Sequence, residues 1–332
     1  MDIGIRRAVV IGANSFTGSQ LAAALLARGS DVLGISRSPE PHEMFLPHRW
    51  APHQRYQFIQ LDLNEQLDEI TAAIRAFEPG VVFNTAAQGM VAQSWQTPQD
   101  WYRTNTLAMA GLHEQLAELP FLERFVHTST PEVYGNTTGI IREDAPWNPT
   151  TPYAVSKAAC DMNLLAYQSV KGLPVCLTRA ANICGPGQQL YRIIPRTILA
   201  VMTGKKLKLE GGGTSIRSFI HIADVIEATL AIAERGQNGG IYHLATEQPV
   251  SIRRLVELIC EQMGADFNEC VELAPARLGQ DAAYLLDCTT ARDELGWQPK
   301  RSLETTITDT IDWMRRYELS IDSQPHAYEH KR

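Results

Sequence analysis

The chain has 332 residues, of which 44% are hydrophobic and 20% charged, a composition typical of globular proteins that excludes disorder as the main state. Its net charge of −7 argues against a surface that coats nucleic acid. The sequence shows no run of about 18 apolar residues, no signal peptide and no CxxC pair among its six cysteines, so we expect a cytoplasmic protein without membrane, nucleic-acid or metal partners.

Short apolar runs alternate with amphipathic stretches in the first half of the chain, which predicts strands separated by helices. The predicted strands are Arg7–Ile11, Asp31–Ile35, Tyr56–Gln60, Val81–Asn84, Phe125–Thr128 and Val175–Arg179. The predicted helices are Gly18–Arg28, Glu65–Phe77, Asp100–Leu119 and Tyr153–Val170. This order implies right-handed crossovers in an α/β fold with an open, doubly wound parallel sheet.

A turn between the first strand and the first helix carries Gly12, Ser15 and Gly18 in the run VVIGANSFTGSQL. Glycines in such a turn let the backbone approach a pyrophosphate at the helix amino terminus, so we expect a nicotinamide dinucleotide here. A plain strand-to-helix turn is the alternative. Ser15 stands where a middle glycine is typical, and its hydroxyl would either donate to phosphate or crowd the site.

The end of the second strand predicts which dinucleotide binds. An acid there would accept from the 2′-hydroxyl of NAD, but the chain has Ser36-Arg37-Ser38. The planar donors of Arg37 suit a phosphomonoester, which favours NADP, with NAD as the alternative if Arg37 is a solvated loop residue. Asp62 follows the third strand and could accept from the adenine amino group.

The segment YAVSK places Tyr153 and Lys157 four residues apart, on one face of a helix. A phenol with an ordinary pKa of about 10 is a weak base at neutral pH, but an adjacent ammonium and a positive nicotinamide ring both favour its phenolate. Such pairs also occur by chance in helices. The position of this one, after five predicted strand–helix steps, favours the catalytic interpretation.

The segment HTSTPEVYG, residues 127–135, follows the fifth strand at the edge of the sheet where open α/β sheets bind ligands. Thr130 can hydrogen-bond a substrate hydroxyl and direct its proton to Tyr153. Glu132 is the only carboxylate of this segment, so it is the candidate for a second acid/base role, with a solvated loop acid as the alternative.

The alternation changes after Arg179, where helices are predicted at Asp224–Arg235, Ile252–Met263 and Thr305–Tyr317. We expect residues 1–183 with 215–245 to form a dinucleotide-binding (Rossmann) domain, and residues 184–214 with 246–320 to form a smaller α/β substrate domain. Residues 321–332 are expected to be a frayed tail, whose His326 and His330 would be exposed to solvent.

Ordered motifs extend over nearly the whole chain, from Arg7 to about Arg316. They are Gly12…Gly18, Ala86-Ala87, Thr104-Asn105, Ser129-Thr130-x-Glu132-Val133-Tyr134-Gly135, Tyr153-x-x-x-Lys157, Gly185-Pro186, Arg217, Arg277-Leu278-Gly279-Gln280-Asp281 and Glu294-Leu295-Gly296-Trp297. With these motifs the chain resembles the extended short-chain dehydrogenase/reductase family, and within it the members that modify nucleotide sugars.

The loop with Thr130 and Glu132 resembles that of the 4,6-dehydratases acting on dTDP-glucose or GDP-mannose, and that of glucuronate decarboxylases. The resemblance implies that Tyr153 takes the proton of the sugar 4-hydroxyl while hydride passes from C4 to the nicotinamide, assisted by Thr130 and Lys157. Glu132 would then remove the C5 proton, the C6 hydroxyl would leave as water, and the hydride would return at C6.

The chain departs from the dTDP-glucose dehydratases at Pro131, where they carry an aspartate that protonates the departing hydroxyl. GDP-mannose dehydratases also lack that aspartate, and Ala87-Gln88 with Ser36-Arg37 resemble them. Gly89-Met90 replace a polar pair in the sugar pocket. These departures leave two alternatives open: an epimerase or uronate decarboxylase that uses the same C4 oxidation, and a dinucleotide-binding protein that has lost turnover.

The resemblance also implies binding residues and partners. The expected cofactor contacts are Gly12, Ser15, Phe16, Thr17, Gly18, Ser36, Arg37, Asp62, Leu63, Ala86, Ala87, Asn105, Tyr153 and Lys157. The expected contacts of the nucleotide-diphosphate sugar are Gln88, Asn182, Arg192, Arg217 and Arg277. The predicted helices Asp100–Leu119 and Tyr153–Val170 would build the contact of a homodimer. The residues do not indicate which base or sugar is bound.

Overall fold

The computed structural model describes residues 4–51, 54–137, 139–275 and 285–330. Its central sheet has seven parallel strands, in the order β12-β7-β5-β4-β1-β2-β3. They are β1 (Arg7–Ile11), β2 (Asp31–Ser36), β3 (Tyr56–Gln60), β4 (Val81–Asn84), β5 (Arg124–Thr128), β7 (Val175–Ala180) and β12 (Ile241–Leu244). The order reverses between β1 and β4, as in a doubly wound dinucleotide-binding sheet, so the predicted α/β fold class is confirmed.

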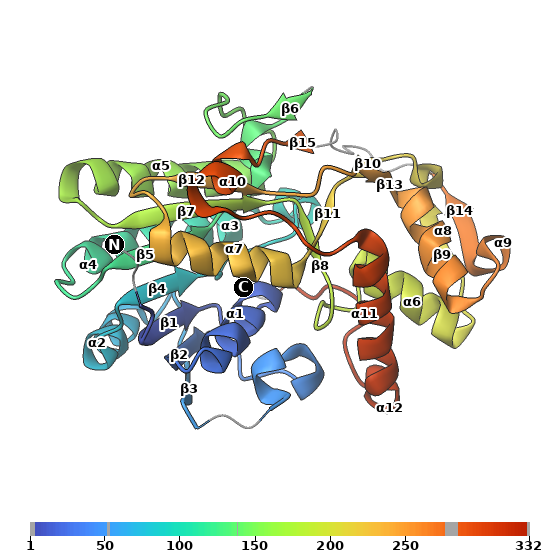
Figure 1. The fold of residues 1–332 in the computed structure, drawn as a ribbon, viewed down its shortest axis with the longest axis horizontal. Coiled ribbons are helices and arrows are strands. Elements are labelled where there is room, and N and C mark those ends of the chain that lie inside the picture. The colour runs from blue at the N-terminus through green and yellow to red at the C-terminus, as the bar shows by residue number, and fades with distance from the viewer. Residues whose placement is uncertain (1–3, 52–53, 138, 276–284, 331–332) are drawn as a thin grey trace.

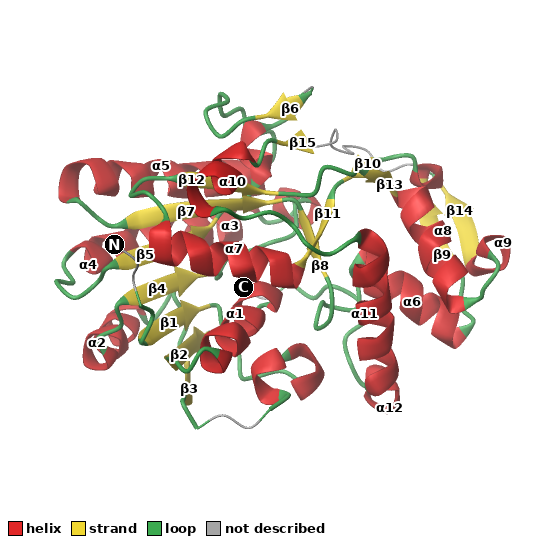
Figure 2. Cartoon of the chain, in the orientation of Figure 1, coloured by secondary structure: helices red, strands yellow, loops and turns green. Residues whose placement is uncertain are grey.

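Helices cover both faces of this sheet (Figures 1 and 2). Along β1, Ala8 and Val10 join one buried core with helices α1 (Phe16–Ala27) and α7 (Ile222–Arg235), while Val9 and Ile11 join a second core on the opposite face. That second core contains α2 (Leu67–Phe77), α4 (Met109–Ala117) and α5 (Pro152–Lys171). Side chains of a strand alternate between its faces, so an unbroken apolar run such as RAVVI is buried on both sides.

The predicted helix Asp100–Leu119 is not α-helical throughout. It consists of α3 (Pro98–Tyr102), a π-helical stretch at Arg103–Ala108 and α4. The wider turn lies where Asn105 is buried and hydrogen-bonded to Gln88 in the loop after β4 and to Ser156 on α5, and such π-turns are frequent at functional sites. A periodicity of 3.6 in the sequence does not reveal this change of winding.

A second unit of the molecule is the part that packs around a core of its own, separate from the cores on the sheet. Its helices are α6 (Ile193–Thr203), α8 (Ile252–Met263) and α11 (Leu303–Arg316). The other described strands and helices of the chain are short: β6 (Ile140–Ile141), β8 (Asn182–Cys184), β9 (Leu207–Glu210), β10 (Ile216–Arg217), β11 (Phe219–His221), β13 (Val250–Ser251), β14 (Val271–Ala274), β15 (Leu285–Leu286), α9 (Phe267–Cys270), α10 (Thr289–Leu295) and α12 (Glu318–Ile321). Helix α10 packs on α7 and β12, so this part of residues 246–320 lies with the main sheet.

The tail differs from the frayed end predicted from the sequence. Ile321 is buried in the core of the second unit, and His330 stacks on Trp101 and hydrogen-bonds Asp100 with its Nε2 atom 2.7 Å from Oδ2. His326 is exposed, as expected, and bonds only to the nearby carbonyl of Ile321. Within the described residues, no helix combines the length and the apolar character needed to cross a membrane.

Candidate active site

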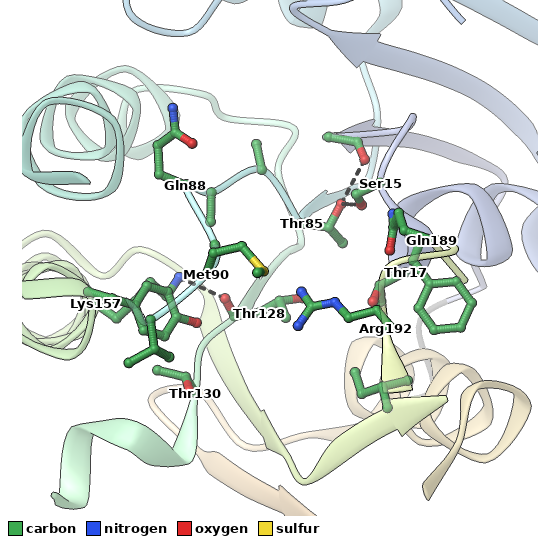
Figure 3. Close-up of a pocket in the computed structure, with 18 of the residues that line it drawn as sticks. Ser15, Thr17, Thr85, Gln88, Met90, Thr128, Thr130, Lys157, Gln189 and Arg192 are labelled. Atoms are coloured by element: carbon green, nitrogen blue, oxygen red, sulfur yellow. Dashed lines mark hydrogen bonds between the residues drawn. The ribbon is translucent and has the colours of Figure 1, made fainter. Parts of the chain in front are cut away.

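A cavity of about 950 Å³ lies at the carboxyl ends of the sheet strands, next to the second unit. It is lined by turns that follow β1, β2, β4, β5 and β7, and by residues of the second unit that include Arg192 and Arg217. Figure 3 shows Lys157 on one side, Ser15 and Arg192 on the other, and the Met90 side chain between them. A hollow at this edge of a doubly wound sheet is the expected place for a ligand.

Two positions near the turn between β1 and α1, Gly12 and Gly18, have no room for a side chain. Gly12 has φ +85°, and a Cβ atom there would lie 2.5 Å from the nitrogen of Ala86. A Cβ on Gly18 would lie 2.2 Å from the carbonyl oxygen of Gly12. The amino terminus of α1 therefore opens to the cavity at Ser15, Phe16 and Thr17 without side chains at the glycine positions, which fits the pyrophosphate of a dinucleotide.

Ser15 lines the cavity, but its hydroxyl is already hydrogen-bonded within the protein. Its Oγ accepts from the nitrogen of Gly18 at 3.0 Å and caps helix α1. It also lies 3.0 Å from the hydroxyl of Thr85, which is within hydrogen-bond distance of the carbonyls of Ile11 and Gly12. A bound phosphate would meet backbone N–H groups here, and the Ser15 side chain is turned to Gly18 and Thr85, so it does not crowd the turn.

The end of β2 also faces the cavity. The Ser36 hydroxyl accepts from the nitrogen of Asn14 at 3.0 Å, and the amide of Asn14 donates to the carbonyl of Ser38 at 2.8 Å. These bonds fix the turn that carries Arg37, which lines the cavity together with Asp62 and Leu63. Asp62 Oδ1 accepts from the nitrogen of Asn64, so one of its oxygens closes a turn.

The structure brings together the four predicted catalytic side chains, Thr130, Glu132, Tyr153 and Lys157, in the wall of the cavity. Thr130 begins a short turn, Pro131–Tyr134, that places Glu132 beside it. Burial raises the pKa of Tyr153 to about 12, while a hydrogen bond with Thr130 and the charge of Arg192 act in the opposite direction. The charge of Glu132 raises this pKa further.

Lys157 is nearly fully buried, with 2% of its surface exposed, and the protein fixes its position. Its ammonium donates to the carbonyl of Thr128 at 2.8 Å, as Figure 3 shows, and lies 2.8 Å from His127 Nε2. Burial and the charge of Lys157 hold the pKa of His127 well below its usual range, so the ring beside the ammonium is neutral. Asn84 contacts the other ring nitrogen.

A buried polar network behind this wall was missed by the sequence analysis. Asp161 accepts from Ser129 at 2.5 Å and from Arg179 at 2.8 Å, and the side chains of this ion pair are fully buried. Arg179 also donates to the hydroxyl of Tyr134 at 2.6 Å, which lies 2.7 Å from His243 Nε2. The signal was present in the sequence, because Asp161 continues the four-residue spacing of Tyr153 and Lys157 on α5.

The loop after β4 forms the floor of the cavity. Asn105 is buried. Its amide oxygen accepts from the nitrogen of Gln88, and its amide nitrogen donates to the carbonyl of Gln88 and to the hydroxyl of Ser156. The Trp101 indole donates to the carbonyl of Gly89. Met90 is held at φ +66° and lines the cavity. Ala86, Ala87 and Gln88 also line it, but the amide of Gln88 points away from Lys157 in Figure 3. Among the described residues of the predicted set, Gly18 and Asn105 do not line the cavity.

Three of the predicted substrate contacts line the side formed by the second unit. Asn182 donates to the carbonyl of Ser218, Arg217 donates to the carbonyl of Ile216, and Arg192 lies over the ring of Tyr191 at 5.5 Å. These groups could hold a second phosphate-bearing ligand opposite Tyr153. Arg277 lies outside the described residues.

Comparisons with known proteins agree with this geometry. Residues 9–310 match the family model described as GDP-mannose 4,6 dehydratase. A dTDP-glucose 4,6-dehydratase of Streptomyces griseus is 32% identical over 93% of this chain and 94% of its own length. Two solved structures are similar. One is DesIV, a dTDP-glucose 4,6-dehydratase of Streptomyces venezuelae with NAD and TDP bound, which has a TM-score of 0.86 and 27% identity over 93% of this chain and 97% of its own. The other is a UDP-glucuronic acid 4-epimerase of Bacillus cereus with UDP-glucuronic acid and NAD bound, with a TM-score of 0.85 and 25% identity over 93% of this chain and 99% of its own.

We predict that the Asp161→Asn substitution destabilises the fold strongly. It leaves the Arg179 charge uncompensated in the core, which typically costs about 3 kcal/mol or more. Chemical denaturation measures the change in the free energy of unfolding. The control is Glu65→Gln, which removes the exposed ion pair with Arg103 and should cost less than about 1 kcal/mol. Equal losses in the two variants would contradict the role of the buried pair.

Proposed function

The chain belongs to the GDP-mannose 4,6-dehydratase family, and on this premise we propose that it is an NDP-hexose 4,6-dehydratase, a lyase that uses a bound nicotinamide dinucleotide. The observation that carries the proposal is the position of Glu132. This carboxylate lines the same cavity as Tyr153, Thr130 and Lys157, so one bound sugar can meet a group for C4 oxidation and a base for elimination.

The residues of the chain divide the work as follows. Tyr153 takes the proton of the sugar 4-hydroxyl, and its hydrogen bond with Thr130 stabilises the phenolate that must form. Lys157 lies on the same face of α5 as Tyr153. Its ammonium contacts Thr128 and His127 of β5, so it supplies positive charge from a fixed position. A nicotinamide dinucleotide held at the turn with Ser15, Phe16 and Thr17 would supply reversible hydride transfer, from C4 of the sugar and back to C6, without net consumption.

Glu132 then removes the C5 proton, which the neighbouring 4-keto group has made acidic. Pro131 offers no proton for the departing C6 hydroxyl, because its side chain can neither donate nor accept. We infer that Glu132, once protonated by C5, passes the same proton to that hydroxyl, which leaves as water. A single carboxyl group thus balances the elimination. When hydride adds at C6, C5 must regain a proton, and the proton that Tyr153 took from the 4-hydroxyl balances this step.

Pro131 also favours a competing function, an NDP-sugar epimerase or NDP-uronate decarboxylase that uses the same C4 oxidation. A protein that binds the dinucleotide without turnover is a further alternative. The products separate these four functions. A dehydratase releases a product lighter by one water, an epimerase conserves mass, a decarboxylase releases carbon dioxide and a silent protein releases nothing.

We expect purified protein incubated with dTDP-glucose, UDP-glucose and GDP-mannose to release a 4-keto product that has lost water from at least one of them, as mass spectrometry would show. The Glu132→Gln variant should lose this product at least about 100-fold while still reducing its dinucleotide, because only proton transfer at C5 is removed. Tyr153→Phe should lose both steps.

The control for this experiment is Glu247→Gln, at an exposed carboxylate that pairs with Arg292 on the surface. It should retain full activity. A product of unchanged mass, or Tyr153→Phe with undiminished turnover, would refute the dehydratase assignment.

We propose that the preferred dinucleotide is NADP. The support is the turn Ser36-Arg37-Ser38, which presents a guanidinium and two hydroxyls where NAD-specific sites carry an acid. The Arg37→Ala variant should bind NADP about tenfold more weakly and NAD almost equally well, because it loses a charge-assisted contact with the 2′-phosphate. Calorimetric titration with both dinucleotides measures this.

The control for the cofactor experiment is Arg55→Ala, at an exposed arginine that bonds the carbonyl of Gly29. It should leave both affinities unchanged. A wild-type protein that binds NAD more tightly than NADP would overturn the preference, as would an equal effect of Arg37→Ala on both dinucleotides.

We propose that the protein is a homodimer built on α3, the π-helical stretch and α5. The support is a group of large apolar side chains exposed on these helices: Tyr102, Leu107, Val155 and Met162. Exposed apolar patches of this kind mark interaction sites. We also propose a cytoplasmic location, since the six cysteines are free thiols.

The double variant Leu107→Asp/Met162→Asp should be monomeric at micromolar concentration, because charges in an apolar contact are costly to bury. Light scattering reports the mass. The control is Leu319→Asp, at a fully exposed leucine of α12, and it should keep the mass of the wild type. A monomeric wild-type protein would refute the dimer.

A further inference from the structure

The C-terminal segment 322–330 crosses from one unit of the molecule to the other. It begins after Ile321, which is buried with α11 and α8, and it ends at His330, which contacts α3 beside the main sheet. In Figure 1 the chain turns back after α12, and its C-terminal label lies over the main-sheet part. Tyr328 and Glu329, near the end of this segment, line the cavity.

His330 anchors the end of the segment. Its ring stacks on Trp101 with the centroids 5.0 Å apart and the planes at 7°, and its Nε2 lies 2.7 Å from Asp100 Oδ2. Trp101 is fully buried and also donates to the carbonyl of Gly89, in the loop that carries Met90. The segment is therefore tied at both ends, while Pro325, His326 and Ala327 between them are exposed.

Tyr328 lies between the two walls of the cavity. Its ring packs edge-on against Tyr191, with the centroids 5.7 Å apart. Burial raises the pKa of Tyr328, and the charges of Arg37 and Arg192 both lower it, so both guanidinium groups lie within electrostatic reach of its hydroxyl. Arg37 follows β2 and Arg192 precedes α6, so the tyrosine connects the cofactor side with the substrate side.

We propose that residues 322–330 form a strap that retains the dinucleotide and that Tyr328 is a further binding residue, in contact with the phosphate-bearing adenosine half. An aromatic ring with a hydroxyl, in a cavity that Arg37 and Arg192 also line, suits an anionic ligand with a flat base. The strap lies beyond residue 310, where the match to the family model ends.

The inference rests on the proposed function, which explains why retention matters. The hydride taken from C4 must return to the same sugar, so a reduced dinucleotide that escaped in mid-cycle would leave an oxidised sugar without its reductant. Apart from Tyr328 and His330, the side-chain hydrogen bonds described for the strap run to residues 320–323, at its beginning. Local release of this segment, without unfolding of the core, would therefore admit a new dinucleotide.

The test measures how fast the reduced dinucleotide leaves. Protein loaded with the reduced form is mixed with excess oxidised form, and the fluorescence change gives the dissociation rate. We expect Tyr328→Ala and His330→Ala to raise this rate about tenfold, and Tyr328→Phe, which keeps the ring, to raise it less. Thermal unfolding at the wild-type temperature would show that each variant is folded.

The matched control is His326→Ala, which removes the other histidine of the same segment and should leave the rate within about twofold of wild type. Wild-type release rates in both Tyr328→Ala and His330→Ala would overturn the strap. Because the readout is dinucleotide release and needs no sugar, this failure differs from that of the proposed function, in which the wild type retains its dinucleotide but releases no dehydrated product.

Discussion

The buried ion pair between Asp161 and Arg179 determines where the reacting side chains stand. It joins helix α5 to strand β7, and Ser129 donates to the same carboxylate from the end of β5. Helix α5 carries Tyr153 and Lys157, while Ser129 precedes Thr130 and the turn with Glu132. One carboxylate in the core therefore fixes both groups of residues relative to each other, which is the kind of preorganisation that catalysis by position requires.

Charged side chains lie both in the wall of the cavity around Tyr153 and behind it around Lys157. Near the ligand space, Arg192 favours the ionised form of Tyr153 while Glu132 disfavours it. Behind them, the Lys157 ammonium donates to a carbonyl and lies beside a histidine whose pKa is held low, so a neutral ring adjoins the only buried lysine of the described residues. Opposing effects on one phenol let its protonation respond to what binds in front of it.

Much of this architecture could be predicted from the sequence. The bounds of β1, β3 and β4 match their apolar runs, the spacing of Tyr153 and Lys157 indicates one helix face, and the family assignment is confirmed. Asp161 was missed because spacing alone does not tell a core acid from a solvated one. The path of the tail was missed because its contacts join residues more than 200 positions apart, and no local pattern encodes them.

Helix α5 also reports on how this fold can change. Tyr153, Lys157 and Asp161 follow one another at intervals of four, and the exposed surface falls from the partly exposed phenol to the buried ammonium and the fully buried carboxylate. Each residue advances a helix by about 100°, so one residue gained or lost between them would turn the phenol away from the ligand or pull the carboxylate out of the core. Substitution at another position of α5 changes one side chain, whereas a change of length across these two turns moves all three of these residues.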